Sequence, residues 1–150
     1  MKGWLLDTNV ISEMSGARPD QKVAKWFDAQ PEHLLFLSIL TLAEYRKGIA
    51  NLSRGDKRRP QFERAVLALE KRFAGRVLSI SDGIALRWGA MSGDAKRLTG
   101  HSPSVIDTML AATAIEHGLY LATRNVVDVT HSGAAVFNPW KDDPELFPLK

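Results

Sequence analysis

The sequence predicts an α/β fold in which helices flank a mainly parallel central β-sheet. Short apolar runs alternate along the chain with longer segments whose apolar residues recur at helical spacing, a pattern typical of parallel sheets with crossover helices. The chain has 150 residues, of which 45% are hydrophobic, so one compact domain over residues 1–150 can bury a core of its own. It contains no cysteine, which excludes disulfides, thiolate metal sites and a cysteine nucleophile.

The first half of the chain contains two expected strands and three expected helices. Residues 4–6 and 34–37 are short apolar runs, with the length and composition of buried strands. An aspartate follows the first run directly, where a strand would pass into a helix. Residues 20–30, 39–52 and 61–73 carry apolar side chains at helical spacing. Their apolar stripes are Val23, Trp26 and Phe27; Leu42, Tyr45 and Ile49; and Phe62, Val66, Leu69 and Phe73.

The second half continues the alternation of strands and helices. A helix is expected to begin at Ser102, because serine is a good N-cap residue and Pro103 suits the first helical position. It should stop at Gly118, since glycine commonly ends a helix in the left-handed conformation. The remaining expected elements are strands at residues 77–80, 119–122 and 135–137 and a helix at residues 82–98.

Polar side chains stand where several of these strands end. Asp7 follows the first strand, Glu44 lies early in the helix after the second, and Asp107 lies early in the helix before Gly118. Asn125 follows the fourth strand, and Asp128 comes one turn later. In a parallel sheet the strands end and the crossover helices begin at one edge, where ligands bind. We therefore expect these side chains to meet at that edge.

Each acid also has a purely structural explanation when it is taken alone. Thr41 with Glu44, and Ser104 with Asp107, match the spacing of a capping box, in which the acid satisfies a backbone donor. Asp7 suits the N-cap of a following helix. These alternatives stay open, but together they require several acids to gather at one edge by coincidence.

The chemistry of such a cluster indicates a divalent cation. Carboxylates that lie close together repel, so they must take up protons or share a cation. An oxygen-rich site without cysteine suits Mg²⁺ or Mn²⁺ and not structural zinc. Such an ion activates water and neutralises phosphate charge.

Four segments resemble the PIN-domain nucleases, above all the VapC-type toxins of bacterial toxin–antitoxin modules, including the FitB-like members. They read LLDTNVIS, SILTLAEYRKGI, PSVIDTMLAATAIEHGLYLATRNVVDV and VFNPW, and they extend over nearly the whole chain. The resemblance implies a PIN-like fold and an Mg²⁺- or Mn²⁺-dependent endoribonuclease that hydrolyses phosphodiester bonds in RNA. It also implies a VapB-type antitoxin as partner, a homodimer, contact with promoter DNA only through the antitoxin, and a cytoplasmic protein without membrane contact.

Carried over to this sequence, the resemblance assigns roles to individual residues. The catalytic carboxylates would be Asp7, Glu44 and Asp107, which would also hold the metal together with Asn125. Asn9, Thr123 and Asp128 would support them, and Arg46 and Arg124 would bind RNA. Asn125 stands where many members of the family carry a fourth acid. Because an amide offers one neutral oxygen, a second metal would be held less tightly than the first.

Positive charge could provide further contacts to RNA. Residues 54–76 contain eight Lys or Arg against three acids. This stretch is typical of a solvated helix face with a basic loop, and the alternative is contact with phosphates. Lys47, residues 54–59 and His101 are weaker candidates for RNA contact. Tyr45, Trp88 and Met91 could contribute to a dimer or simply to the core.

Other protein classes fit the residues less well. A haloacid-dehalogenase-type phosphatase needs a second acid at the position of Asn9, and a receiver domain needs adjacent early acids and a late lysine. A dinucleotide-binding domain needs a glycine-rich turn after the first strand, but residues 7–14 contain no glycine. A catalytically silent PIN-fold module, whose acidic pocket only receives an arginine from a partner, stays open as the alternative.

Overall fold

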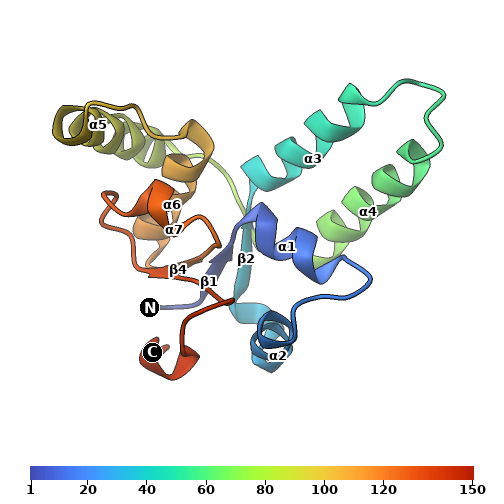
Figure 1. Ribbon diagram of the computed structural model, residues 1–150, viewed down its shortest axis with the longest axis horizontal. Coiled ribbons are helices and arrows are strands. Elements are labelled where there is room, and N and C mark those ends of the chain that lie inside the picture. The colour runs from blue at the N-terminus through green and yellow to red at the C-terminus, as the bar shows by residue number, and fades with distance from the viewer.

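A five-stranded, all-parallel sheet forms the centre of the molecule, as a computed structural model of residues 1–150 shows (Figure 1). The strands lie in the order β3-β2-β1-β4-β5. Their bounds are Trp4–Leu6 for β1, Leu35–Ser38 for β2, Val77–Leu78 for β3, Tyr120–Ala122 for β4 and Val136–Phe137 for β5. The predicted fold class is confirmed, and every predicted strand is present within two residues of its expected ends.

The chain also forms seven helices and two short 3-10 turns. The helices are α1 (Thr8–Met14), α2 (Gln21–Ala29), α3 (Ile39–Asn51), α4 (Arg59–Arg72), α5 (Asp82–Thr99), α6 (Val105–His117) and α7 (Val126–Val129). The 3-10 turns are η1 (Glu32–Leu34) and η2 (Pro144–Leu146). All helices expected between residues 20 and 118 are confirmed. Helix α7 was not predicted, because it is a single turn and too short to show periodicity.

The strand order reverses between β1 and β4. The chain passes from β1 to β2 and β3 on one side, and then returns to place β4 next to β1 on the other side. Asp7 and Thr123 are the first residues beyond these two strands. Such a reversal leaves a crevice at the carboxyl ends of the strands, which is where open α/β sheets bind ligands.

The core lies in two layers on opposite faces of the sheet. Trp4 and Leu6 belong to a cluster with residues of α1 and α2, whereas Leu5 belongs to a cluster with residues of α6. Successive side chains of a strand point to opposite faces. Both faces of β1 are therefore buried, and this explains why its residues form an uninterrupted apolar run.

Helices α3 and α4 form a pair that extends beyond the sheet (Figure 1). Of the stripe predicted for α4, Val66 and Phe73 are buried, whereas Phe62 near the far end is 40% exposed. Residues 52–58 form the connection at that far end, so the basic stretch 54–59 lies there. The apolar stripe is thus buried mainly where the pair approaches the sheet.

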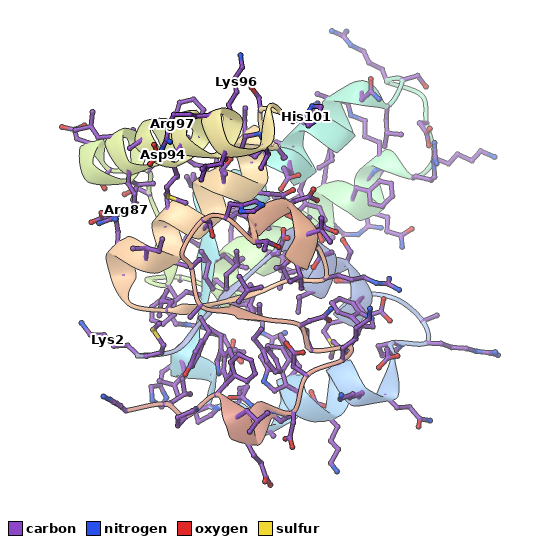
Figure 2. All side chains as sticks on the ribbon, turned by 60° about the vertical axis from the view of Figure 1, so that its left-hand side comes forward. Lys2, Arg87, Asp94, Lys96, Arg97 and His101 are labelled. Atoms are coloured by element: carbon purple, nitrogen blue, oxygen red, sulfur yellow. The ribbon has the colours of Figure 1, made fainter.

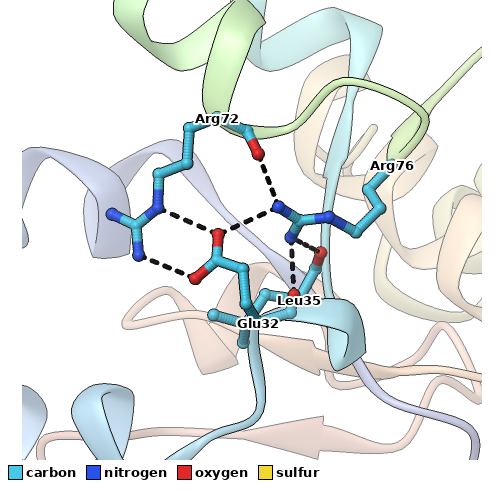
Figure 3. Close-up of polar contacts among 4 residues, drawn as sticks. All are labelled: Glu32, Leu35, Arg72 and Arg76. Atoms are coloured by element: carbon cyan, nitrogen blue, oxygen red, sulfur yellow. Dashed lines mark hydrogen bonds and ion pairs between the residues drawn. The ribbon is translucent and has the colours of Figure 1, made fainter.

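The C-terminal end of α4 is tied to the start of β2 by a network around Glu32 (Figure 3). The Glu32 carboxylate accepts hydrogen bonds from Arg72 and Arg76 at 2.9–3.1 Å. Arg76 also donates to the carbonyl oxygens of Glu32 and Leu35. Arg72 holds the pKa of Glu32 below its usual value, with a smaller contribution from Arg76.

The predicted start of α6 is wrong. The helix begins at Val105, and Ser104 is its N-cap, with a hydroxyl that accepts from the backbone N–H of Asp107. Serine stands on both sides of Pro103, and proline also fits the extended segment before an N-cap. The hydrogen bond to Asp107 favours the later serine. Gly118 ends the helix with a φ of 64°, as predicted.

The last residues pack against the sheet. Phe147 and Leu149 contact the core cluster that contains Trp4. The Phe147 ring lies edge-on to Phe137, with the ring centroids 4.9 Å apart. No helix of the molecule combines the length and apolar character that crossing a membrane requires.

Candidate active site

Asp7 is the most strongly held acid of the site. It is 5% exposed and caps α1. The backbone N–H of Thr8 donates to its Oδ1 at 2.6 Å, and the Thr123 hydroxyl donates to its Oδ2 at 2.6 Å. Burial raises the pKa of Asp7 above its usual value, although these hydrogen bonds oppose the shift. The charge of Glu44 raises the pKa further.

Asn9 and Thr123 surround the same carboxylate. The Asn9 amide donates to Asp7 Oδ2 at 3.2 Å and to Thr123 Oγ1 at 3.3 Å. Thr123 Oγ1 also accepts from the backbone N–H of Asn125 at 3.0 Å. The hydroxyl therefore links the end of β4 to the end of β1. These are the positions that supporting residues would need, and their catalytic role stays a prediction.

Glu44 is held by a residue that the sequence analysis missed. The Thr8 hydroxyl donates to Glu44 Oε1 at 2.7 Å. A capping role for Glu44 is wrong, because Ser38 caps α3 and places Glu44 in its second turn. Thr41, the other half of the supposed box, is buried inside the fold. The feature of the sequence that could have identified Thr8 as a residue of the site is its position directly after Asp7.

Asp107 lies in the first turn of α6 and is half-buried. Burial is the largest cause of a raised pKa at this carboxyl, and the charge of Asp7 raises it further. The charge of Asp128 on α7 raises it as well. Asp107 therefore connects the Asp7 side of the site to α7.

The three predicted catalytic acids line one open pocket of about 500 Å³ at the carboxyl edge of the sheet. Its lining is almost wholly polar. The lining residues are Asp7, Thr8, Asn9, Ser12, Glu13, Glu44, Asp107, Arg124, Asn125 and Trp140. Four segments that are distant in the sequence thus bring side-chain oxygen atoms to one pocket. Glu13 is an acid that the sequence analysis missed, and it accepts a hydrogen bond from the backbone N–H of Asp20.

Of the remaining predicted residues, some line this pocket and others lie outside it. Arg124 lines the pocket, with its guanidinium 5.1 Å from the centroid of the Trp140 ring. Arg46 instead forms an ion pair with Glu70 on α4 at 2.9 Å. Both side chains of this pair are exposed, so the pair contributes little to stability. Another anion, such as a phosphate, could therefore replace Glu70 as the partner of Arg46. Asp128 lines a neighbouring cavity and reaches this pocket only through Asp107.

The donor set suits a hydrated divalent cation better than a closed metal cage. No three His, Cys, Asp or Glu side chains converge closely enough to enclose a bare ion. Mg²⁺, however, usually keeps several waters and binds through one or two carboxylates. Burial raises the pKa of both Asp7 and Asp107, and the charge of a neighbouring carboxylate adds to each shift. A cation would relieve that repulsion.

Comparison with known proteins agrees with this geometry. The family model described as PIN domain matches residues 4–126, which is most of the chain. The chain belongs to the PIN domain family. Toxin FitB of Neisseria gonorrhoeae is 38% identical to this PIN domain protein over 138 residues, which cover 92% of the chain and 99% of the relative. VapC ribonuclease Y4jK of Sinorhizobium fredii is 36% identical over 137 residues, covering 91% of the chain and 97% of the relative.

Solved structures of related proteins have the same fold. The structure of FitAB bound to an IR36 DNA fragment aligns with a TM-score of 0.82 at 36% identity, over 93% of this chain and 97% of that one. The structure of VapBC-1 from nontypeable Haemophilus influenzae aligns with a TM-score of 0.73 at 25% identity, over 92% of this chain and 98% of that one. The PIN-like fold that the resemblance implied is therefore confirmed.

Proposed function

We propose that this PIN domain protein is a metal-dependent endoribonuclease and the toxin of a VapBC-type toxin–antitoxin module. One observation carries the proposal: Asp7, Glu44 and Asp107 come from distant elements and line one polar pocket where the strand order reverses. The names of the relatives support it, since they include a toxin and a ribonuclease. PIN-domain nucleases generally use divalent metal ions.

Asp7, Glu44 and Asp107 would hold Mg²⁺ or Mn²⁺, with Asn125 as an additional neutral ligand. When bound, the ion would supply an activated water and would neutralise charge on the phosphate. The residues of the chain fix the carboxylates. Thr123 and Asn9 orient Asp7, and Thr8 orients Glu44. The cleaved strand would carry a 3′-hydroxyl on one side and a 5′-phosphate on the other.

Arg124 is the stronger of the two candidate RNA contacts. It lies at the pocket and its guanidinium can pair with a phosphate in a bidentate manner. Arg46 would have to leave Glu70, or bind RNA from the outer side of that pair. Lys47 lines a separate depression between α3 and α6, next to Glu44.

The proposed partner is a VapB-type antitoxin, and the proposed assembly is a homodimer. Support comes from similar structures, one of which is described as a toxin–antitoxin complex and another as FitAB bound to DNA. Promoter DNA would be contacted through the antitoxin. A cytoplasmic location follows from the proposed substrate.

A cleavage assay on a pool of structured and single-stranded RNAs tests the proposal. Wild type, Asp7→Asn and a control variant, Asp28→Asn, would each be assayed with Mg²⁺, with Mn²⁺ and with excess chelator. Asp28 is an exposed acid on α2, away from the site. We expect wild type and Asp28→Asn to cut only with metal, and Asp7→Asn to stay folded but inactive. Full cutting by Asp7→Asn, or in chelator, would contradict the assignment.

The alternative function is a silent binding module whose acidic pocket receives an arginine from a partner. The observation in its favour is that no three acids converge closely enough to enclose an ion. Under this alternative, wild type would cut no RNA in either metal. It would still bind an arginine-containing segment of its antitoxin, and Asp7→Asn would weaken that binding.

A further inference from the structure

A second cavity lies beside the acidic pocket and has no role in the proposed chemistry. It measures about 300 Å³ and is lined by the end of α5, the segment between α5 and α6, and the α7 region. Asp107 lines the acidic pocket, whereas its neighbour Thr108 lines the cavity together with Asp128. The first turn of α6 therefore lies on the boundary between the two spaces.

We propose that this cavity receives one unstacked nucleobase of the RNA next to the phosphate that is cut, and that His101 and His131 select it. The inference rests on the proposed ribonuclease function and deepens it. The volume lies at the lower end of small-molecule pockets, which span roughly 300–1,000 Å³. It suits a single base and not a stretch of nucleotides.

The lining matches the surface of a base. Met91 and Ala95 of α5 supply apolar surface for the faces of the ring. His101 and His131 come from segments thirty residues apart and both line the cavity. Imidazole rings stack on bases and can donate or accept hydrogen bonds. Ser102 adds a hydroxyl beside them.

The charges favour a base inside the cavity and the backbone outside it. Asp128 is an acid in the wall and would repel a phosphate, but its carboxylate can accept from the amino group of a base. Positive charge lies on the outer side of α5. Figure 2 shows Lys96 projecting from α5 into solvent, with His101 just beyond the end of the helix. Arg97 is already paired with Asp94 on the same helix, which leaves Lys96 as the freer cation.

The cut-site sequences of a random RNA pool test the inference. The double variant His101→Ala/His131→Ala would be compared with wild type and with His33→Ala, which changes an exposed histidine on η1. Each good contact to a base changes the discrimination between bases by about 5- to 150-fold. We expect wild type and His33→Ala to prefer one base at a position beside the cut. The double variant should still cut but should lose about tenfold of that preference.

Ser102→Tyr provides a second variant that obstructs the cavity without removing a histidine. It should flatten the same position of the cut-site profile. Identical base preferences in wild type, the double variant and Ser102→Tyr would overturn the inference. Circular dichroism would establish that each variant is folded.

A failure of the proposed function would be recognised separately. If wild type cut no RNA, binding of short labelled oligonucleotides that differ in one base would be measured by fluorescence anisotropy. Base-dependent affinity that the double variant loses would support the cavity without cleavage. Affinity that is independent of the base would overturn it.

Discussion

Replacing Thr123 by valine tests whether the link between β4 and β1 positions the site. Thr123 is 1% exposed, and its hydroxyl donates to Asp7 Oδ2 at 2.6 Å. Valine has nearly the same shape, so the change removes one hydroxyl and leaves the packing. A hydrogen bond to a charged group contributes about 1.5–3 kcal/mol. The backbone N–H of Asn125 loses its acceptor too, but it lies near the open pocket, where water can replace the hydroxyl.

The expected destabilisation is therefore about 2 kcal/mol, which lowers the Tm of a chain of this size by roughly 4–8 °C. Loss of such a supporting hydrogen bond also reduces metal affinity or activity by roughly 10–100-fold. Thermal unfolding followed by circular dichroism, a metal titration and an RNA cleavage assay measure the three effects.

Thr113→Val is the matched control. Thr113 is equally buried, but its hydroxyl donates to a backbone carbonyl within α6, at Met109. A neutral hydrogen bond contributes about 1 kcal/mol, so this variant should lose some stability and no activity. Wild-type cleavage and metal affinity in Thr123→Val would contradict the role of Thr123 in positioning Asp7. A loss of activity in Thr113→Val as large as that in Thr123→Val would contradict it as well.

Four further predictions follow from the geometry. Glu32→Gln should lower the free energy of unfolding at pH 7 by less than about 1 kcal/mol, because the pair is half exposed. Because the pKa of Glu32 is lower in the folded state than the unfolded value of 4.5, its carboxylate stabilises the fold above pH 4.5. This stabilisation is lost as the pH falls through the folded pKa, so the free energies of unfolding of Glu32→Gln and wild type should become equal in acid. Asn125→Asp should tighten Mg²⁺ in a calorimetric titration while the apo Tm changes little, because Asn125 is exposed at the pocket. Ser104→Ala should destabilise by about 1 kcal/mol and Ser102→Ala by less than about 0.5 kcal/mol, since Ser104 caps α6. If residues 1–150 form one domain, circular dichroism and tryptophan fluorescence should report one coincident unfolding transition.

Each of these predictions has an outcome that contradicts it. A constant difference between Glu32→Gln and wild type down to strongly acid pH would mean that the carboxylate does not act through its charge. An unchanged metal titration would remove Asn125 from the site. Equal losses at Ser102 and Ser104 would contradict the observed start of α6. Two separate transitions would divide the chain into two units.

The sequence was sufficient to predict which strand ends supply the site, because that depends only on the alternation of strands and helices. Asp7 and Thr123 follow neighbouring parallel strands, and their contact needs no further information. The start of α6 could not be predicted, because the two serines beside Pro103 have the same local chemistry. The capping alternative for Glu44 failed for a related reason. It depended on where α3 begins, and the Ser38 hydroxyl starts that helix three residues earlier than Thr41.

Asp128 shows the limit of reasoning from strand ends. It follows β4 closely, as a residue of the site should, but it lies on the one-turn helix α7. Such a short helix has no periodicity that fixes its rotation, so the sequence could not indicate which way the carboxyl group points. In the structure it lies beside Asp107 and lines the second cavity.

The acids are held with unequal rigidity, and this has a consequence for how the site works. Asp7 is fixed by hydrogen bonds from both neighbouring strand ends, and Thr8 ties Glu44 to the same position. Asp107 has no comparable hydrogen bond to Asp7, and the charges of Asp7 and Asp128 both raise its pKa. A cation held by Asp7 and Asp107 would lower the pKa of both carboxyls, because it favours their ionised forms. Since Asp107 and Asp128 interact through their charges and Asp128 lines the second cavity, the charge felt where we propose that the base is read would then depend on whether the metal site is loaded.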